Sequence, residues 1–306
     1  MAIMEGIQER PISKNISVGV EAIVEWLGAR TSSCCGVQIS QEETHKLSQI
    51  IQNRMTALSV NDPILYFQLV ESQSAEGVTE WDQLLARFMN GETFFFRDRG
   101  QFTLLKEQIL PTLIQRRQTV RTLRIWSAGC STGEEAYSLA ILVDQLLPDR
   151  RNWDISILAT DINVRSIQHA QQGMYGQWAF RKVDTELLQR YFTQTGSQWV
   201  LNQSIRKMVT FRQCNLVADT FPSATLGIND LDLILCRNVF LYFHTEAIGQ
   251  VMKKMAESLV SDGFVLTGHG ELPAQTVGAL QAKIYPDSVI YQRPQVACAG
   301  SSGSSR

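Results

Sequence analysis

The segment from Arg124 to Ser138 constrains the fold of this chain more than any other. Its residues, RIWSAGCSTGEEAYS, form an apolar run, a loop with Gly129 and Gly133, and a helical stretch that begins at Glu134. Glycine permits positive φ angles and close approach of a ligand to the backbone, and the start of a helix presents free N–H groups. In open α/β sheets such units hold ligands beyond the carboxyl ends of the strands. We therefore predict an α/β fold with a small organic cofactor on this loop.

The acidic residues of the loop narrow the choice of cofactor. A phosphate-binding P-loop ends in Gly-Lys-Ser/Thr, whereas this loop continues from Gly133 into Glu134 and Glu135. A dinucleotide site requires G-x-G-x-x-G, but this loop reads G-x-x-x-G and places carboxylates where a pyrophosphate would lie. S-adenosylmethionine has no phosphate and carries an ammonium and a sulfonium, which a glutamate can hold. The loop therefore favours S-adenosylmethionine.

Strands and helices alternate after Arg121, which predicts a largely parallel sheet covered on both faces. The further strands are Ile155–Thr160, Leu231–Cys236 and Phe264–Thr267, with a closing hairpin at Ala282–Arg293. This order is typical of a class I methyltransferase with a Rossmann-like sheet, which we assign to residues 119–294. Trp199–Leu201 and Met208–Arg212 predict a small antiparallel β insertion at about residues 194–216.

The chain before this sheet has no strand pattern. Apolar residues at helical spacing, such as Leu47, Ile51 and Met55, predict a small all-α domain over residues 40–118. Residues 1–39 read as a weakly ordered extension, with a short helix that ends near Gly28 and a linker at Thr31–Gly36. The Gly/Ser-rich residues 295–306 predict a flexible tail.

Three other segments carry polar residues near the expected ligand edge of the sheet. Asp161 ends a strand, where it can accept hydrogen bonds from two ribose hydroxyls or cap the next helix. Asn238 follows Leu231–Cys236, and loops at strand ends carry most ligand contacts. In GETFFFRD, Thr93 and Arg97 are candidates to cover the cofactor, unless the segment only packs the junction between the two parts of the chain.

Composition excludes several classes of protein. The net charge is −2, from 28 basic and 30 acidic residues, so no global charge favours nucleic acid or a membrane surface. No apolar run approaches the ~18 residues that span a bilayer, and the N-terminus lacks a signal-type apolar stretch. Six cysteines form no C-x-x-C pair, and four scattered histidines have no metal-ligand spacing. We therefore expect a cytoplasmic protein with reduced thiols and no metal.

Together the motifs resemble the CheR chemotaxis methyltransferases. GETFFFRD, SAGCSTGEEAYS, ATDIN and LCRNVFLYF match the family patterns N-E-T-x-F-F-R-D, S-A-G-x-S-x-G-E-E-x-Y-S, A-x-D-I and F-C-R-N-V-x-I-Y-F in the same order. The similarity covers residues 40–293, and the family carries a small antiparallel subdomain where the β insertion lies. The resemblance implies methyl transfer from S-adenosylmethionine to glutamate side chains of chemoreceptors, with S-adenosylhomocysteine as the product.

The resemblance also implies which residues contact the cofactor. They are Thr93, Arg97, Glu134, Asp161, Asn215, Leu216, Asn238 and Val239, and Arg97 is the one candidate for a catalytic, orienting role. Gly91 stands where the family commonly has asparagine. The resemblance therefore implies this position as part of the cofactor site, but without a contact from a side chain. Asn90, one residue earlier, is a partial substitute for the missing asparagine. The motif TGHGEL departs from the family's usual serine after the histidine, and His269 is assigned no role.

A glutamate acceptor requires no general base, because its carboxyl group has a reference pKa of ~4.3 and is ionised at neutral pH. Exclusion of water and alignment of the reacting atoms should then supply most of the acceleration. We expect the β insertion and the helix Gln41–Ser59 to face the receptor, and the protein to be monomeric. The alternatives are a non-catalytic, cofactor-binding regulator of a signalling array, and a methyltransferase that acts on a protein nitrogen or a small molecule.

Overall fold

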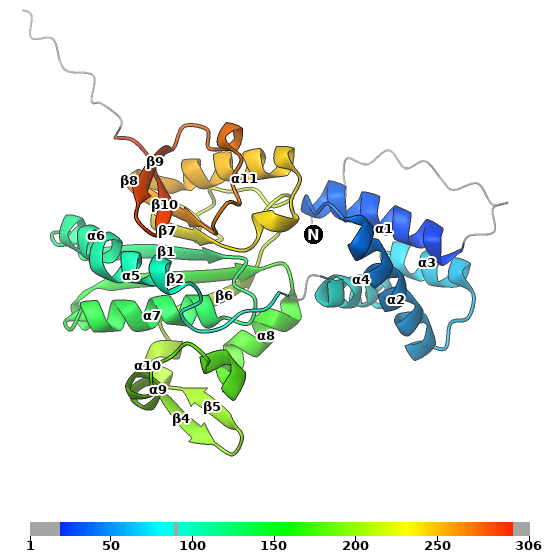
Figure 1. The fold of residues 1–306 in the computed structure, drawn as a ribbon, viewed down its shortest axis with the longest axis horizontal. Helices are drawn as coiled ribbons and strands as arrows, with labels where there is room; N and C mark the ends of the chain where they lie inside the picture. Colours follow the sequence, from blue (N-terminus) through cyan, green and yellow to red (C-terminus); the bar gives the residue numbers. More distant parts are fainter. Residues whose placement is uncertain (1–18, 89–90, 296–306) are drawn as a thin grey trace, which may run out of the picture.

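The computed structural model describes residues 19–88 and 91–295. Within these ranges, the first four helices pack around one apolar cluster. They are α1 (Val20–Cys35), α2 (Gln41–Ala57), α3 (Pro63–Glu71) and α4 (Ala75–Phe88). Figure 1 shows them as a group beside the larger, sheet-containing part of the molecule. No helix in the described ranges is long and apolar enough to cross a membrane.

The first helix corrects the prediction for residues 1–39. α1 continues through Gly28 and ends at Cys35, so the predicted linker at Thr31–Gly36 is helical for most of its length. The side chain of Thr31 is buried and donates a hydrogen bond of 2.9 Å to the carbonyl of Leu27, which lets this polar residue continue the helix. The prediction that residues 1–39 are weakly ordered is therefore wrong from residue 20 onward. Residues 1–18, and residues 296–306 of the predicted tail, lie outside the described residues.

A buried ion pair joins the helices of this first part. Arg54 of α2 donates two hydrogen bonds, of 2.9 and 2.6 Å, to Glu80 of α4, and Tyr66 of α3 donates a third of 2.7 Å. Burial and the neighbouring carboxylate raise the pKa of Tyr66 well above its usual value. All three side chains are nearly inaccessible to solvent, so the network fixes how α2, α3 and α4 pack.

A broken helix leads into the sheet. α5 (Arg99–Leu104) passes through a π-helical turn (Leu105–Ile109) into α6 (Leu110–Arg117), and Pro111 lies in the first turn of α6. Proline cannot donate to the preceding turn, so a helix that continues past it must reorganise its hydrogen bonds there. The π-helical turn therefore comes directly before the α-helix that contains Pro111.

The main sheet has seven strands in the order β6-β2-β1-β7-β8-β10-β9. The strands are β1 (Thr122–Ala128), β2 (Asp154–Asp161), β6 (Val209–Gln213), β7 (Leu231–Cys236), β8 (Leu259–Thr267), β9 (Gln281–Tyr285) and β10 (Ser288–Gln292). The first five are parallel, and β9 and β10 form the predicted antiparallel hairpin at one edge. The strand order reverses between β1 and β7, so their carboxyl ends border the crevice where such sheets bind ligands. The predicted class I methyltransferase fold is confirmed.

Helices cover both faces of this sheet (Figure 1). α7 (Glu134–Leu146) packs on one face together with Ile125 and Leu233, whereas α11 (Thr245–Ser258) packs on the other with Trp126 and Ile234. Neighbouring strand residues thus point to opposite faces, and both faces are apolar. This burial on two sides fixes the strand ends that carry the candidate site.

A second, three-stranded sheet corrects the predicted β insertion. It consists of β3 (Met174–Gly176), β5 (Gln198–Leu201) and β4 (Phe192–Thr195), in that order and antiparallel. Met208–Arg212 was predicted to belong to it, but β6 pairs in parallel with β2 at the edge of the main sheet. Val209 is buried in the core below α7, which explains its place there. The small sheet therefore begins near Met174 and ends at Leu201.

The remaining short helices connect these parts. They are α8 (Val164–Gln172), which follows β2, α9 (Thr185–Tyr191), which precedes β4, and α10 (Gln203–Arg206), which follows β5. A 3₁₀ turn at Gln177–Phe180 joins β3 to α9 and lies against the segment before α5. The small sheet is thereby attached directly to residues near the crevice.

Candidate functional site

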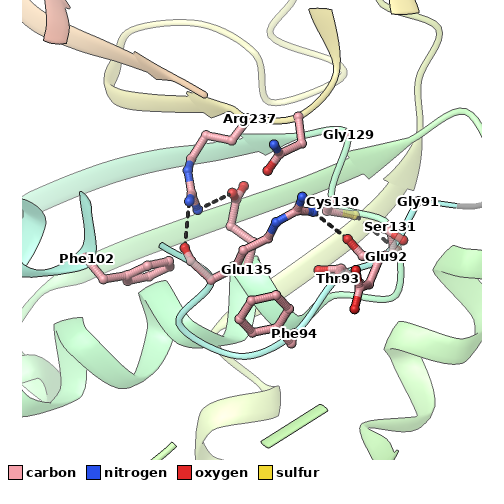
Figure 2. A pocket seen from close by; sticks show the side chains of 12 residues that line it. Gly91, Glu92, Thr93, Phe94, Phe102, Gly129, Cys130, Ser131, Glu135 and Arg237 are labelled. Carbon is pink, nitrogen blue, oxygen red and sulfur yellow. Dashed lines mark hydrogen bonds and ion pairs between the residues drawn. The ribbon is translucent and has the colours of Figure 1, made fainter. Parts of the chain in front are cut away.

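A cavity lies at the carboxyl ends of β1 and β7, and about 460 Å³ of empty space, partly open to solvent, lies within it. Three stretches distant in sequence meet here: the segment before α5, the loop after β1, and the turn after β7. The lining residues are Gly91, Glu92, Thr93, Phe94, Arg97, Phe102, Gly129, Cys130, Ser131, Glu135, Arg237 and Asn238 (Figure 2).

The loop after β1 presents its backbone to this cavity. Gly129 has a φ of 74°, and a Cβ atom there would lie 2.4 Å from Cγ2 of Val239. Gly133 has a φ of 93° and is the N-cap of α7, which begins at Glu134 as the sequence predicted. The amides of Gly129 and Cys130 both donate to the carbonyl of Thr160, which ties the loop to the end of β2. Only glycine at residue 129 allows this approach of the two loops.

Arg237 is the central cation of the cavity floor. Its guanidinium donates to Gln101 at 2.5 Å, to Glu135 at 3.0 Å and to the carbonyl of Arg97 at 2.6 Å, and it lies over the ring of Phe102. Figure 2 shows Arg237 pointing toward Glu135 across the cavity. The side chain is buried, so these partners replace its hydration. Arg237 thereby joins α5, α7 and the segment before α5 around one charge.

The two glutamates at the start of α7 have different surroundings. Glu135 lines the cavity, and its second oxygen accepts a hydrogen bond of 2.7 Å from Ser127. Glu134, the predicted cofactor contact, is not among the lining residues; its carboxylate accepts a hydrogen bond of 2.7 Å from Thr132. Burial raises the pKa of Glu134. The carboxylate that faces the cavity is therefore that of Glu135.

The segment at residues 91–98 covers the cavity, and hydrogen bonds from two of its backbone amides hold it in place. The amide of Phe95 donates to the carbonyl of Ala179 at 3.0 Å, and the amide of Phe96 donates to the hydroxyl of Ser138 at 3.0 Å. Phe96 has a positive φ of 55°, as expected for a sharply bent loop. The segment presents Thr93 and Arg97 to the cavity, as predicted.

Charged and aromatic side chains line the outer end of this segment. Arg97 donates to the carbonyl of Glu92, while the Glu92 carboxylate pairs with Arg181 at 2.6 Å. The guanidinium of Arg181 lies 3.6 Å from the ring centre of Phe94 and 4.4 Å from that of Trp178. Trp178 is 68% exposed, so this stack faces solvent. Two arginines therefore stand at or beside the mouth of the cavity.

Asp161 lies next to the cavity but does not line it. One carboxylate oxygen accepts a hydrogen bond of 2.8 Å from the amide of Ser131, and the other accepts one of 2.8 Å from the amide of Asn163. Burial raises the pKa of Asp161, while these two amides lower it. Asn163, not Asp161, caps α8. The carboxylate thus braces the loops after β1 and β2, and its contact with a ribose stays a prediction.

The residues predicted at the end of β6 are engaged elsewhere. The side chain of Asn215 accepts from the amides of Val217 and Ala218 and donates to the carbonyl of Cys34 at 2.8 Å. Leu216 is buried in the cluster below α11. Asn215 therefore joins the end of α1 to the sheet-containing part. Neither side chain lines the cavity, so their cofactor contacts stay predictions.

The structure thus brings together part of the predicted set. Gly91, Thr93, Arg97 and Asn238 line the cavity, and Val239 lies against the glycine loop. A Cβ atom at Gly91 would meet no atom of the described residues within 4 Å, so there is room for the first atom of a side chain at this residue. The cofactor contacts of these residues are not tested by their positions alone.

Sequence reasoning missed Arg237 and Gln101 as site residues. Gln101 is buried and bridges Arg237 to the carbonyl of Thr267, at 2.8 Å, and to Ser288. Arg237 stands beside Asn238 at the end of a strand, and this position indicates a site residue in the same way as it does for Asn238. Gln101 carried none, because nothing in a helical pattern distinguishes a buried glutamine from a solvated one.

The residues of the cavity fit S-adenosylmethionine. The glycine loop offers backbone, Phe94 and Phe102 offer apolar surface, and Glu135 offers a carboxylate for a cationic group. Arg237 pairs with the carboxylate of Glu135, and this carboxylate keeps lone pairs that can accept hydrogen bonds from a ligand. A phosphate bound in the same space would be repelled by this carboxylate, because both groups are negatively charged. The two carboxylates and two guanidinium groups that line the cavity therefore suit a zwitterionic organic ligand better than a nucleotide polyphosphate.

Comparisons with known proteins agree with this fit. The family model described as "CheR methyltransferase, SAM binding domain" matches residues 91–282. The chain is 30% identical over 244 residues to "Chemotaxis protein methyltransferase 1" of Pseudomonas aeruginosa, which covers 78% of this chain and 85% of that protein. It is 28% identical over 240 residues to a "Chemotaxis protein methyltransferase" of Borreliella burgdorferi, and the match covers 77% of this chain and 83% of that protein.

A third relative is much longer. The chain is 32% identical over 226 residues to an uncharacterised 104.1 kDa protein of Rhodobacter capsulatus, and the match covers 74% of this chain but only 23% of that protein.

The predicted resemblance is confirmed by the family model and the relatives, and with it the prediction of an S-adenosylmethionine-dependent methyltransferase. The chain belongs to the CheR methyltransferase family.

Proposed function

We propose that this protein acts in the cytoplasm. There it transfers a methyl group from S-adenosylmethionine to glutamate carboxylates of chemoreceptor cytoplasmic domains. The observation that carries the proposal is the cavity at the β1–β7 switch point, which combines a glycine loop with the carboxylate of Glu135. The names of the relatives from Pseudomonas aeruginosa and Borreliella burgdorferi support a role in chemotaxis. A chemoreceptor as the acceptor is the further step that we propose from that role.

The proposed cofactor contacts surround this cavity. Thr93, Arg97 and Asn238 line it, Glu135 supplies the facing carboxylate, and Val239 supports the glycine loop. Asp161 is proposed for the ribose hydroxyls, and Glu134 and the backbone of Asn215–Leu216 for the rim. S-adenosylmethionine, when bound, supplies a methyl group on a positively charged sulfur. The residues of the chain bind and orient it and exclude water.

The chemistry of the acceptor explains the charges at the mouth of the cavity. A carboxylate that approaches is already ionised and needs no base. Arg97 lines the cavity and Arg181 lies beside it, so both cations attract and orient an anionic side chain. Opposite charges are lost as the methyl group moves, so exclusion of water by Phe94 and the segment around it favours the reaction.

The division of labour along the chain is part of the proposal. The helices α1–α4 form one domain and the sheet-containing part the other, which carries the cofactor. The small β3–β5–β4 sheet and α2 are proposed as the surfaces that face the receptor. Lys46 of α2 is exposed and suits an acidic partner, whereas the strands of the small sheet carry no basic residue.

Mass spectrometry of a receptor fragment tests the acceptor. A purified chemoreceptor cytoplasmic fragment is incubated with the protein and S-adenosylmethionine, digested, and sequenced in the gas phase. We expect added methyl groups on glutamate side chains alone, and none in a reaction without enzyme. Methyl groups on lysine, arginine or histidine nitrogen would contradict the proposed acceptor. Cofactor binding without transfer to any receptor fragment would favour a regulatory protein instead.

The Asp161→Ala variant tests the ribose contact. It is expected to bind S-adenosylhomocysteine roughly 10- to 100-fold more weakly, the effect of about 1.5–3 kcal/mol for hydrogen bonds to a charged group. Because Asp161 also holds Ser131 and Asn163, calorimetry is repeated with a 2′,3′-dideoxyribose analogue. A direct contact predicts that the wild type prefers the ribose ligand and that the variant loses this preference. A variant that keeps the full preference would remove the ribose assignment.

A further inference from the structure

Glu92 places a glutamate side chain of the protein itself at the cavity. It lines the cavity next to Thr93 (Figure 2). Its backbone is fixed, because the carbonyl of Glu92 accepts a hydrogen bond from Arg97. Its carboxylate accepts a hydrogen bond of 2.6 Å from Arg181. The fold therefore holds a carboxylate, of the same chemistry as the proposed acceptor, beside the proposed cofactor site.

Arg181 is held by contacts that do not depend on this carboxylate. Its guanidinium lies 3.6 Å from the ring centre of Phe94 and 4.4 Å from that of Trp178. It also donates a hydrogen bond of 2.9 Å to the carbonyl of Trp178. A planar guanidinium that is stacked on aromatic rings and hydrogen-bonded to the backbone has little freedom to move. The cation therefore stays in position if Glu92 leaves it.

The turn that carries this cation is joined to the segment over the cavity. Arg181 directly follows the 3₁₀ turn at Gln177–Phe180. The amide of Phe95 donates a hydrogen bond of 3.0 Å to the carbonyl of Ala179 in this turn. The rings of Phe95 and Phe180 are stacked, with 5.1 Å between their centres. The fold therefore fixes the place of Arg181 relative to the cavity.

The two members of the ion pair are held to different degrees. The side chain of Glu92 is 63% exposed, whereas that of Arg181 is 18% exposed. An exposed carboxylate gains little from an ion pair, because water competes for its charge. Another carboxylate can therefore take its place while the arginine stays stacked. A fixed cation with a loosely held anion is a site at which carboxylates can exchange.

We propose that Glu92 occupies the binding site of the acceptor carboxylate, and that the acceptor glutamate replaces it on Arg181 when the receptor docks. Arg181 is then a specificity-determining residue, because a guanidinium favours an anionic side chain over a neutral one. The exposed ring of Trp178 extends the site with apolar surface for the methylene groups of that side chain. This inference rests on the proposed glutamate acceptor.

Steady-state kinetics with the receptor cytoplasmic fragment test the exchange. S-adenosylmethionine is kept saturating for each variant, so that cofactor affinity does not enter. Glu92→Gln removes the internal anion and keeps its size, and should lower KM for the fragment about two- to fivefold, the range of an exposed ion pair. Arg181→Gln removes the cation and should raise KM at least about tenfold. A KM of Glu92→Gln equal to or above that of the wild type would overturn the proposal.

The double variant separates exchange at Arg181 from general repulsion. If Glu92 merely repels an anionic receptor, Glu92→Gln lowers KM by the same factor with or without Arg181. Exchange predicts that Glu92→Gln brings no gain once Arg181→Gln is present, because the two carboxylates no longer compete for one cation. An equal gain in both backgrounds would overturn the proposal.

Asp184→Asn is the matched control. Asp184 pairs with Arg99 at 3.3 Å, and both side chains are exposed. The variant therefore also frees an arginine, but Arg99 is not among the residues that line the cavity. Its KM should equal that of the wild type. A gain as large as that of Glu92→Gln would show that any freed surface cation is sufficient, and would overturn the role of Arg181.

The outcomes separate this proposal from the proposed function. Wild-type protein that methylates the receptor fragment, with a KM that Glu92→Gln does not lower, overturns the exchange and leaves the proposed function intact. Wild-type protein that binds S-adenosylhomocysteine in calorimetry but transfers no methyl group to the fragment overturns the proposed acceptor, and the exchange with it. Because Glu92 is exposed, Glu92→Gln should fold normally, so its KM decides the proposal even if Arg181→Gln does not fold.

Discussion

The Arg237→Met variant is expected to lose about 3–5 kcal/mol of unfolding free energy, the cost of removing one partner of a buried ion pair. Methionine fills the space of the aliphatic stem but offers no donor. Glu135, whose side chain is 14% exposed, would lose its cation, and Gln101 and the carbonyl of Arg97 would lose their donors. Because these groups lie in or under the cavity, binding of S-adenosylhomocysteine should be lost as well.

Urea unfolding and calorimetry measure these two effects. Arg99→Met is the matched control, because the pair of Arg99 with Asp184 at 3.3 Å is exposed and should contribute less than about 1 kcal/mol. The double variant Arg237→Met with Glu135→Met removes both buried charges and should regain most of the stability but not the binding. A loss below about 1 kcal/mol in Arg237→Met, similar to the control, would contradict the central place of Arg237.

The Gly129→Ala variant is expected to lose cofactor binding by at least about 100-fold, the effect of roughly 3 kcal/mol of loop rearrangement. A Cβ atom at this residue would lie 2.4 Å from Cγ2 of Val239, closer than real contacts allow. The backbone also has a φ of 74°, which alanine adopts only with strain. The loop after β1 or the turn after β7 must therefore move, and both border the cavity.

Two variants separate the steric clash from the backbone strain. Gly227→Ala has the same kind of strain, with a φ of 76°, but a Cβ atom there meets no atom of the described residues within 4 Å. It should bind the cofactor normally. Gly129→Ala combined with Val239→Ala removes Cγ2 and should recover part of the affinity that the single variant loses. Calorimetry that finds equal binding for Gly129→Ala and Gly227→Ala would contradict the close contact of the two loops.

The sequence predicted the glycine loop because the requirement there is local. Positive φ at Gly129 and Gly133 and a helix start at Glu134 follow from a few adjacent residues. The strands predicted from apolar runs also agree closely with β1, β2 and β7, because burial on both faces produces a continuous apolar pattern. These elements fixed the fold class and the edge on which the cavity lies.

Pairing partners could not be predicted in the same way. The pattern at Met208–Arg212 indicates a strand, but its partner β2 lies some fifty residues away, and alternation carries no information on which strand pairs with which. The small sheet was misplaced for this reason. Likewise, α1 continues past Gly28 because of the hydrogen bond of Thr31 and the buried face of the helix, which outweigh the weak helix preference of these residues.

The polar floor of the cavity was missed because its partners come together only in the folded chain. Gln101 reaches Thr267 and Ser288, and Arg237 reaches Gln101 and Glu135. A buried polar residue is recognised by its partners rather than by its own position in a helix or strand.

The release of methanol under mild alkali tests the central claim most directly. The protein is incubated with S-adenosylmethionine labelled in the methyl group and with membranes that carry chemoreceptors, and the washed protein fraction is then treated with alkali. Methyl esters of carboxylates hydrolyse under these conditions, whereas methyl groups on nitrogen or on ether oxygen do not. We predict label on the receptor that is released as volatile methanol, and none when Gly129→Ala replaces the wild type. Label that stays on the protein after alkali would contradict the transfer to glutamate.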